Sequence, residues 1–387
     1  MVFRARHMEK IRELFESFPV VGIIGARQVG KTTLARQVVD QCAREYHFFD
    51  LENPEDMARL ADPMLALKDL HGLIVIDEIQ RMPELFPILR VLADRATQAA
   101  QFLILGSASP DLLRKGSESL AGRIFYYELT GFSVDEVGLE HWQTLWLRGA
   151  FPRSYLARTL NASVDWRKGF IRTFLERDIP QLGIKISSTT LRQFWSMLAH
   201  YHGQVWNASE IGRSFGMAHT TIKNYLDILT SALVIRQLHP WYENISKRQV
   251  KSSKVYFSDS GLLHSFLGIE TSRDLGGHPK IGASWEGFVI EQLIRQLDIE
   301  FSDCYFWATH SGAELDLMVV RGATRLGFEI KRTCTPRMSA SMQSALDSLK
   351  LDNLTIIHAG EHSFQIAEQV RAMAFENMFE EIKPLRR

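Results

Sequence analysis

The chain has 387 residues, which exceeds one ordinary hydrophobic core and predicts two or three domains. Its 45 Lys and Arg residues balance 45 Asp and Glu residues, so overall charge indicates neither a nucleic-acid nor a membrane partner, and any such surface must be local. The sequence has neither an apolar run of the roughly 18 residues that span a membrane nor the apolar core of a signal peptide. The three cysteines are far apart and lack metal-ligand spacing, which favours a reducing compartment. We therefore expect a cytoplasmic protein with no membrane partner.

The first motif follows the apolar run "PVVGII" at residues 19–24, which predicts a buried strand. Residues 25–32 then spell G-x-x-x-x-G-K-T, the Walker A pattern. Its glycines let backbone N–H groups point at phosphate oxygens, its lysine reaches the β and γ phosphates, and its threonine hydroxyl binds Mg²⁺. A helix that begins here directs its positive end at the anion. The predicted ATP-binding residues are Gly25, Ala26, Arg27, Gln28, Val29, Gly30, Lys31, Thr32 and Thr33; the alternative is a glycine-rich turn without a ligand.

A second motif, "LIVIDEIQ" at residues 73–80, places two acids at the end of an apolar strand. Asp77 is in the Walker B position and is expected to hold Mg²⁺, while Glu78 is expected to polarise the attacking water as general base. The alternative is an acidic helix cap that follows a strand. Together the two motifs predict Mg²⁺-dependent ATP hydrolysis, with Lys31 and Glu78 as catalytic residues.

Two further polar residues lie near predicted strands. Ser107 ends the apolar run "QFLIL" and is a candidate sensor of the γ-phosphate; a serine that caps a turn is the alternative. Arg123 precedes the next strand and is a candidate arginine finger, which usually acts on the nucleotide of a neighbouring subunit and would imply a homo-oligomer. The alternative is a solvated or internally paired arginine.

Five segments carry a family resemblance: "GARQVGKTTLARQ", "LIVIDEIQRMPELFPILR", "LGSAS", "LAGRIFYYEL" and "GAFPRSYLA". They resemble the predicted AAA-superfamily ATPases of bacteria and archaea, in which an N-terminal ATPase domain precedes a C-terminal domain of unknown function. The resemblance covers nearly the whole chain and implies an AAA-type P-loop ATPase core at about residues 1–131. Relatives commonly carry Thr-Gly-Ser at the sensor strand, whereas Leu105 precedes Gly106 and Ser107 here.

Residues 132–190 read as a helical lid or linker, with apolar faces formed by Trp142, Leu145, Trp146, Phe170, Phe174 and Leu175. Residues 191–260 are predicted to form a winged helix. Within this range a short helix that ends at Gly216 precedes a second helix, which would present His219, Thr220, Lys223 and Asn224. This is helix-turn-helix spacing, in which the second helix enters the major groove.

A strand and a hairpin are expected to follow these helices and to form the wing. Between Arg236 and Lys254 there are five basic residues and one acid, Glu243, which is a local basic patch suited to phosphate contacts. The predicted nucleic-acid contacts are Lys223, Lys247, Arg248, Lys251 and Lys254. The alternative is a winged helix that contacts protein or serves only as a scaffold.

The last predicted domain, residues 261–387, combines acids and a lysine on a helix and two strands. Glu286 lies on a helix at residues 282–297, Asp316 on one strand, and Glu329 and Lys331 on one face of the next. The pattern resembles the PD-(D/E)xK nuclease superfamily, which implies that Glu286, Asp316 and Glu329 hold Mg²⁺ and that Asp316, Glu329 and Lys331 cleave a phosphodiester. Glu314 shares the face of Asp316 as a further ligand or a solvated neighbour. The alternatives are a nuclease-like fold that does not cleave, and an ordinary edge strand with exposed charges.

These segments predict an α/β multidomain protein with a P-loop AAA-type core, a winged-helix middle and a C-terminal α/β nuclease-like domain. We expect an ATP-hydrolysing, DNA-associated ATPase whose nucleotide state gates the C-terminal half. The alternative is an ATP-dependent switch that binds a protein partner through a non-cleaving C-terminal half. A further alternative is a factor in which ATP binding licenses assembly.

Overall fold

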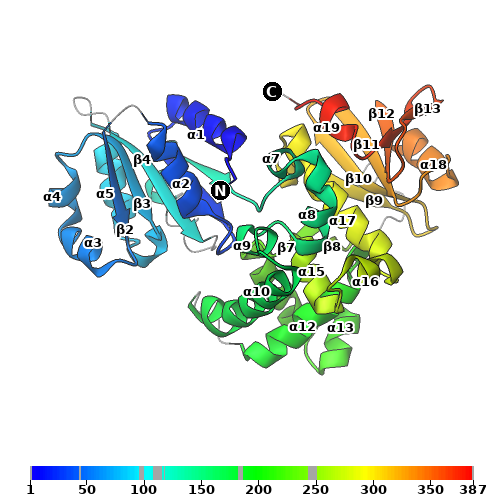
Figure 1. The fold of residues 1–387 in the computed structure, drawn as a ribbon, viewed down its shortest axis with the longest axis horizontal. Helices are drawn as coiled ribbons and strands as arrows, with labels where there is room; N and C mark the ends of the chain where they lie inside the picture. The colour runs from blue at the N-terminus through cyan, green and yellow to red at the C-terminus, as the bar shows by residue number, and fades with distance from the viewer. Residues whose placement is uncertain are drawn as a thin grey trace. The chain divides into compact units, whose positions relative to one another are not determined.

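The computed structural model describes residues 2–42, 45–95, 100–107, 116, 118–181, 186–242 and 251–385. The chain divides into two compact units, Met1–Phe132 with Ser231–Leu233, and Ser133–Thr230 with Val234–Arg387 (Figure 1). The three parts expected after the ATPase core, residues 132–190, 191–260 and 261–387, fall in the second unit except for Phe132 and Ser231–Leu233.

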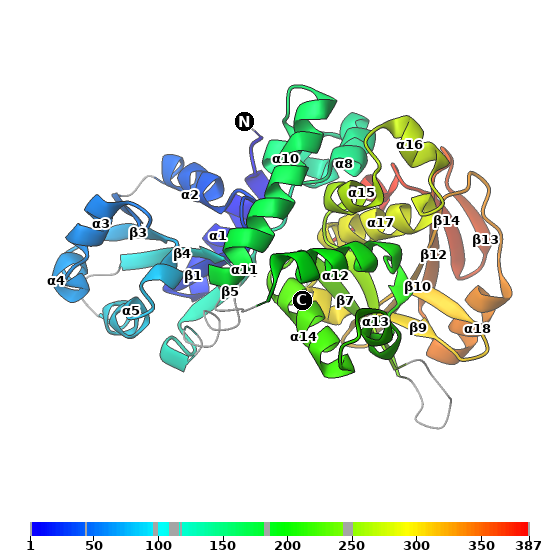
Figure 2. The same ribbon diagram turned by 90° about the horizontal axis from the view of Figure 1, so that it is seen from below.

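The first unit is built on a five-stranded sheet in the order β2-β3-β4-β1-β5. Every neighbouring pair in it is parallel. The strands are β1 (Val20–Gly25), β2 (Tyr46–Asp50), β3 (Gly72–Asp77), β4 (Ala100–Ser107) and β5 (Ile124–Glu128). The helices are α1 (Ala5–Ser17), α2 (Lys31–Asp40), α3 (Pro54–Arg59), α4 (Pro63–Leu67), η1 (Ile79–Arg81) and α5 (Leu85–Ala93). Helices α2 and α5 lie on opposite faces of the sheet, which is the arrangement of a three-layer α/β unit (Figure 2).

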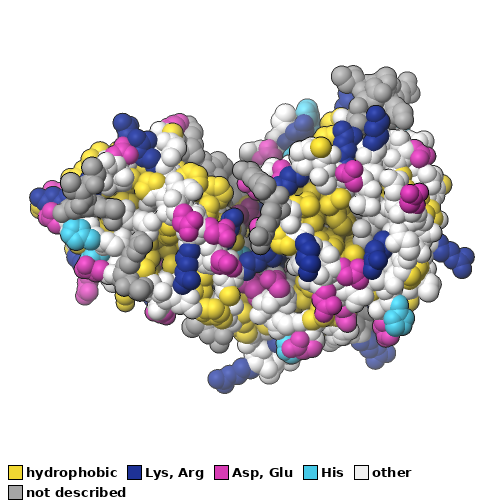
Figure 3. All heavy atoms as spheres, turned by 90° about the horizontal axis from the view of Figure 1, so that it is seen from above, with side chains coloured by type: hydrophobic (Ala, Val, Ile, Leu, Met, Phe, Trp, Pro, Cys, Tyr) yellow, Lys and Arg dark blue, Asp and Glu magenta, His cyan; other side chains and the backbone are white. Residues whose placement is uncertain are grey.

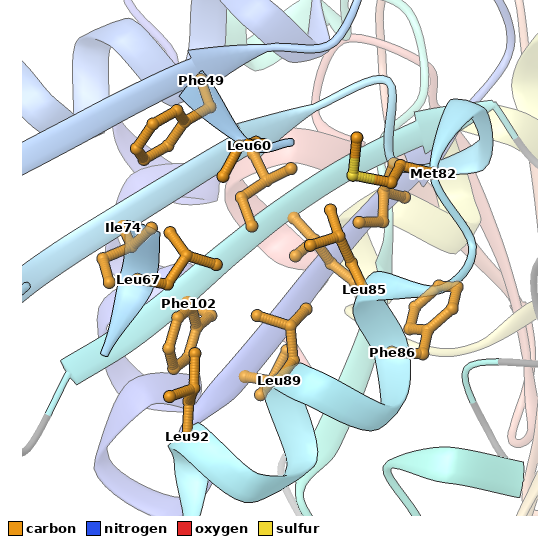
Figure 4. Packing of buried hydrophobic residues seen from close by; sticks show 14 of the residues in the cluster. Phe49, Leu60, Leu67, Ile74, Met82, Leu85, Phe86, Leu89, Leu92 and Phe102 are labelled. Carbon is orange, nitrogen blue, oxygen red and sulfur yellow. The ribbon is translucent and has the colours of Figure 1, made fainter. Parts of the chain in front are cut away.

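One hydrophobic layer of this unit lies between the sheet and α4 and α5 (Figure 4). Alternate residues of the central strands point into it, including Ile74 and Ile76 of β3 and Phe102 of β4. On α5, Leu85 and Leu89 are four residues apart and face the same layer. The apolar residues repeat every two positions on the strands and every three to four on the helix, so they all face one continuous core. Packing in this core holds in place the strands that carry the site residues.

Strand direction brings the predicted motifs to one edge of the sheet. Gly25 lies beside Ser107 in the β1–β4 register, and Asp50 lies beside Asp77 in the β2–β3 register. The carboxyl ends of β1, β3 and β4 therefore meet, which is where ligands bind in open parallel sheets.

The second unit begins with helices and 3₁₀ or π turns. These are α7 (Val134–Val137), η2 (Leu139–His141), α8 (Trp142–Arg148), α9 (Pro152–Tyr155), α10 (Leu160–Thr173), η3 (Phe174–Asp178), α11 (Ile179–Gln181) and α12 (Ser188–His200). This part, predicted as a helical lid or linker, is built mainly of helices. Five of the six expected apolar-face residues are buried, and Trp142 is half-buried. The aromatic stripe is core packing: Phe170 stacks on Phe174, and Phe174 packs on Trp195.

A nine-stranded mixed sheet runs through the rest of the unit in the order β13-β14-β12-β11-β10-β9-β7-β8-β6. Its strands are β6 (Gln204–Val205), β7 (Ile235–Pro240), β8 (Lys254–Phe257), β9 (Cys304–Ala308), β10 (Glu314–Arg321), β11 (Thr324–Lys331), β12 (Asn353–His358), β13 (Phe364–Ala367) and β14 (Val370–Ala374). The helices and short turns are α13 (Ala208–Phe215), α14 (His219–Ser231), α15 (Ser260–Leu267), α16 (Ser272–Gly277), α17 (Ile281–Leu297), η4 (Phe301–Asp303), α18 (Ala340–Leu349) and α19 (Met378–Glu381).

The predicted winged helix and the predicted nuclease-like domain share this sheet. Strand β7 pairs with β8 on one side and, in parallel, with β9 on the other, where His239 lies opposite Tyr305. The two segments are thus joined by backbone hydrogen bonds. No helix within the described ranges is both long and apolar enough to cross a membrane.

Candidate nucleotide site and C-terminal carboxylate cluster

The loop between β1 and α2 has the backbone of a phosphate cradle. Gln28 and Gly30 have left-handed φ angles of 63° and 102°, and Gly30 caps α2 without a side-chain hydrogen bond. A Cβ on Gly25 would lie 2.5 Å from the carbonyl oxygen of Leu129, so only glycine fits there. A non-glycine residue held at positive φ is strained, and such strain is concentrated at functional sites. The side chains of Ala26 and Val29 are buried and that of Thr33 is exposed, so these residues line the loop mainly through their backbone.

Lys31 and Thr32 begin α2 and turn back over this loop. The Lys31 side chain is buried, and its Nζ donates hydrogen bonds to the carbonyl oxygens of Gly25 (3.1 Å) and Ala26 (3.0 Å). The Thr32 hydroxyl donates to Asp77 Oδ2 at 2.6 Å. The two expected Mg²⁺ ligands are therefore in direct contact, although they are 45 residues apart in the sequence.

The two acids after β3 have different environments. Burial raises the pKa of Asp77, while hydrogen bonds from Thr32 and from the Glu78 N–H oppose this rise. Burial also raises the pKa of Glu78, opposed chiefly by the positive charge of Lys31. Glu78 has a left-handed φ of 58°, and the Gln80 amide donates to its carboxylate. Glu78 is thus a strained, partly buried carboxylate with a weakened tendency to ionise, which suits a general base.

Ser107 lies at the end of β4, next to Gly25. Its Oγ is buried and has no hydrogen-bond partner among the described residues. A buried hydroxyl without a partner carries a desolvation cost, which a phosphate oxygen at this edge would remove. The sensor role expected for Ser107 therefore remains a hypothesis that its position supports.

Sequence reasoning missed a set of charged neighbours. Asp50 ends β2 beside Asp77 and contributes to the rise in the pKa of Asp77. Glu52 lies 3.5 Å from both Arg27 and Arg81, and so it links the P-loop to the turn after β3. The available signal was the repetition of an aspartate at the end of an apolar strand, "FFD" before "VID".

Arg123 lies at the edge of the sheet opposite the P-loop. It precedes β5, and its carbonyl accepts the N–H of Val20 at the start of β1. Its guanidinium forms two hydrogen bonds with Asp94, at 2.6 and 2.8 Å. Because all five strands are parallel, Arg123 cannot contact a nucleotide held by its own P-loop. Action on a neighbouring subunit is the remaining form of the arginine-finger hypothesis.

The expected arrangement of the C-terminal acids is present in part. Glu286 lies on α17, and β10 with Asp316 pairs with β11, which carries Glu329 and Lys331. The Lys331 Nζ is 2.6 Å from Glu329 Oε1, as expected for residues on one face of a strand. Asp316 Oδ2 accepts the backbone N–H of Ile330 at 2.9 Å.

Lys254, which was expected to contact nucleic acid, is instead buried at 2% exposure. Its Nζ lies 3.4 Å from Glu286 Oε1 and 3.6 Å from Asp316 Oδ1, and it also contacts Glu314. The reason is tertiary packing: both faces of β8 are covered, so all four of its residues, Lys254 included, are buried. Burial disfavours the ammonium, but the carboxylates around it hold the pKa of Lys254 well above its usual range.

The expected three-carboxylate metal site is not found in this form. Among the residues that the structure describes, no three His, Cys, Asp or Glu side chains are grouped so as to hold a metal ion. Lys254 approaches Glu286 and Asp316, and Lys331 approaches Glu329. Burial raises the pKa of Glu286 to about 7 and that of Glu329 to about 7. We call Glu286, Glu314, Asp316, Glu329, Lys254 and Lys331 the carboxylate cluster.

The segment predicted as a helix-turn-helix contains the helices α13 and α14. Helix α13 ends at Gly216, whose φ is 63°, and the first residues of α14 are exposed. Lys223 and Lys251 are exposed, whereas Arg236 is buried against Glu291 at 3.2 Å and does not belong to a basic surface. Lys247 and Arg248 lie outside the described residues. On the face shown in Figure 3, the Lys and Arg side chains of the described residues are interspersed with Asp and Glu.

Three family models match successive parts of the chain. Residues 17–138 match an AAA domain family, residues 139–273 a domain of unknown function (DUF8612), and residues 281–378 another (DUF4143). The solved structure of a Walker-type ATPase from Pyrococcus abyssi is similar to this chain with a TM-score of 0.50 at 15% identity, covering 69% of this chain and 96% of that one. At this identity the likeness concerns the fold alone. The protein thus has a P-loop AAA-type fold followed by further domains.

Two close relatives show the family. An uncharacterized protein of Mycobacterium bovis and one of Mycobacterium tuberculosis are each 53% identical to the chain over 364 residues, 94% of this chain and 82% of each relative. The chain belongs to their family. Its own domain matches make it an AAA-superfamily ATPase with additional domains of unknown function.

Proposed function

We propose that the protein binds ATP with Mg²⁺ at the carboxyl edge of the first sheet and hydrolyses it. The observation that carries this proposal is the convergence of polar side chains from separate motifs at that edge. Thr32 is 2.6 Å from Asp77, and Ser107 lies beside Gly25 with an unpartnered hydroxyl. A glycine-rich turn without a ligand would not require these groups to meet.

Each residue has a defined part in the proposed reaction. Lys31 exchanges its two backbone carbonyl acceptors for phosphate oxygens of ATP. Mg²⁺, which neutralises phosphate charge when bound, would be held by Thr32 and Asp77. Glu78 accepts a proton from the attacking water, and its raised pKa increases its strength as a base. The Ser107 hydroxyl donates a hydrogen bond to the terminal phosphate.

Two variants test this proposal by separating binding from chemistry. Lys31→Ala should lower phosphate release at least about 100-fold because a charge aimed at the phosphates is removed. Glu78→Gln should retain ATP binding but lower turnover by about 100-fold or more. Lys68→Ala removes an exposed lysine from the same unit and serves as the control. Wild-type turnover in Lys31→Ala would contradict the assignment.

We further propose that the protein associates with DNA through α14 and the segment before β8. The N-terminal half of α14 exposes Lys223 and Asn224 and so has the accessibility of a recognition helix. The turn before it is tight, because a Cβ on Gly212 would lie 2.7 Å from the carbonyl oxygen of Met217. Lys251 is exposed just before β8 and adds a second positive charge.

Salt-dependent binding of a DNA duplex, measured by fluorescence anisotropy, tests this association. The double variant Lys223→Glu/Lys251→Glu should bind about tenfold more weakly and should lose nearly 2 units of the slope of log affinity against log salt. Lys350→Glu/Lys383→Glu makes the same charge change at exposed sites elsewhere and is the control. If both double variants lost the same DNA affinity, the binding would reflect only the overall charge of the protein and not a DNA-binding surface at α14.

Nucleotide gating of the second unit is the third element of the proposal. DNA affinity should differ between the ATP-loaded and ADP-loaded states of Glu78→Gln, which binds ATP but hydrolyses it slowly. The alternative is a switch for a protein partner, which the helix pair would also suit. If the DNA affinity is the same with ATP and ADP and does not change in the lysine variants, this alternative is favoured.

A further inference from the structure

The carboxylate cluster holds its own cation. Lys254 comes from β8 and reaches carboxylates on two other elements, α17 and β10. Its stem passes the ring of Phe306, with Nζ 5.6 Å from the ring centroid. The Tyr256 hydroxyl donates to Glu286 Oε1 at 2.5 Å, so the same oxygen receives both a neutral and a charged donor.

The cation takes the oxygens that a metal would need. Glu286 Oε1 and Asp316 Oδ1 face the ammonium, and Asp316 Oδ2 accepts the N–H of Ile330. Glu329 Oε1 faces Lys331. Glu329 Oε2 is buried without a partner among the described residues, but one oxygen is far from the six or so ligands that Mg²⁺ takes. Waters can complete such a shell, but they do not remove the repulsion between a divalent ion and a buried ammonium.

Burial makes the ammonium hard to displace. A buried lysine is stable as a cation only while carboxylates compensate its charge, and removal of one partner leaves an uncompensated charge. Lys254 lies on an inner strand, and its side chain is 3% exposed, so it cannot leave the cluster for solvent without a rearrangement of β8.

We infer that Lys254 is the fixed counter-cation of the carboxylate cluster, in the place of the divalent metal of a PD-(D/E)xK nuclease, and that the C-terminal half engages its partner without cleaving phosphodiesters. The lysine then joins β8, next to the proposed DNA-contacting segment, to α17 and β10. This inference does not depend on ATP hydrolysis, so failure of either proposal leaves the other intact.

Manganese binding to the nucleotide-free full chain is the decisive measurement. Free Mn²⁺ is counted by electron paramagnetic resonance for the wild type and for Asp316→Asn, so that any binding at the P-loop cancels between the two. We expect equal Mn²⁺ occupancy in both proteins, and no degradation of single- or double-stranded DNA with Mg²⁺ or Mn²⁺. Mn²⁺ binding or DNA cleavage that is present in the wild type and lost in Asp316→Asn overturns the inference.

The lysine itself is tested with Lys254→Met. Its unfolding midpoint should fall by about 10 °C, because three carboxylates lose their counter-cation. Mn²⁺ should raise this midpoint by more in Lys254→Met than in the wild type, in which only binding at the P-loop contributes. Lys251→Met, which removes an exposed lysine three residues earlier, is the control and should change neither value. A midpoint equal to that of the control would overturn the inference, and if Lys254→Met does not fold, the manganese measurement on the wild type still decides.

Discussion

Among the described residues, each unit contains one buried lysine, and the two lysines have different hydrogen-bond and ion-pair partners. Lys31 is 6% exposed and donates to neutral carbonyl oxygens of its own loop. Lys254 is 2% exposed and lies among the carboxylates of Glu286, Glu314 and Asp316. Hydrogen bonds to neutral carbonyls are weaker than those to ionised acceptors, so a phosphate can replace the partners of Lys31. The partners of Lys254 already carry the charge that a ligand would offer.

The difference separates a binding site from an internal contact. In the first unit Lys31 donates to two neutral carbonyl oxygens, and the backbone has left-handed angles at Gln28 in the P-loop and at Glu78 after β3. In the second unit the ammonium of Lys254 is compensated by carboxylates within the protein. A lysine and several acids in proximity therefore do not by themselves indicate catalysis; the identity of the lysine's acceptors decides.

The largest expected effect contrasts the same substitution at the two lysines. Lys31→Met should lower ATP turnover at least about 100-fold and change the unfolding midpoint little, because only hydrogen bonds of small net worth are lost. Lys254→Met should lower the midpoint by about 10 °C and leave turnover per folded molecule within about twofold. Phosphate release and calorimetry on the same preparations measure both.

The turnover of Lys254→Met can contradict this contrast. If Lys254→Met reduced turnover as strongly as Lys31→Met in the absence of DNA, the cluster would belong to the nucleotide machinery. The comparison between an exchangeable and a permanent lysine would then be wrong.

The second effect concerns pH. Burial lowers the pKa of His202 to about 3 and that of His264 to about 4, both in the second unit. In the unfolded chain these histidines bind a proton below about pH 6.5. Between pH 6.5 and 4 the unfolded state therefore binds more protons, and stability falls as the pH is lowered, by up to about 1.4 kcal/mol per pH unit for each histidine.

Two carboxyl groups change the pH dependence of stability in the opposite direction, so the contribution of His202 must be isolated with a variant. The raised pKa values of Glu286 and Glu329, about 7 each against 4.5 unperturbed, favour the folded state as the pH is lowered toward 4.5. Denaturant unfolding between pH 4 and 7.5 should show a smaller loss toward acid in His202→Gln than in the wild type. The control His219→Gln, at an exposed position on α14, should keep the wild-type slope. An unchanged slope in His202→Gln would show that His202 is protonated in the folded protein.

The third effect compares two glycines that allow close backbone approach. A Cβ would lie 2.5 Å from a carbonyl oxygen at Gly25 and 2.7 Å at Gly212. Gly212→Ala should cost about 1–3 kcal/mol of stability by overpacking and should weaken DNA binding, because it distorts the turn before α14. Gly169→Ala, on α10 with open space around its Cβ, is the control and should be neutral or slightly stabilising. Unfolding curves that coincide for the two variants would argue against a tight helix-turn-helix.

The smallest effect concerns Arg123. Its ion pair with Asp94 is exposed, so Arg123→Ala and Asp94→Ala should both leave the unfolding midpoint nearly unchanged. If the arginine acts on a neighbouring subunit, Arg123→Ala alone should lower turnover, and only at protein concentrations at which the wild type self-associates. If both variants had the same turnover at every protein concentration, Arg123 would have no role in ATP hydrolysis.

The sequence by itself determined the local framework of the proposed nucleotide site. Strand, loop and helix are adjacent in the chain from Val20 to Asp40, and glycine allows the close approach at Gly25 and the left-handed angle at Gly30. Asp77 and Glu78 were recognisable because they end a strand whose apolar residues predict burial. The helix pair and β7 also followed from local patterns and local stop signals, of which Gly216 is one.

Only the tertiary structure decided the partners of the charged residues. The direction of β5 places Arg123 away from the nucleotide, and the strand order places Asp50 beside Asp77 and Ser107 beside Gly25. The sequence predicts Lys254 as part of a basic surface. In the structure β8 is buried, and the Lys254 ammonium lies beside Glu286 and Asp316. Charge in a sequence is a property of single residues, whereas its neutralisation depends on contacts between elements 30 or more residues apart. The sequence could therefore predict a phosphate-binding loop, but not that Lys254 is paired with carboxylates inside the protein.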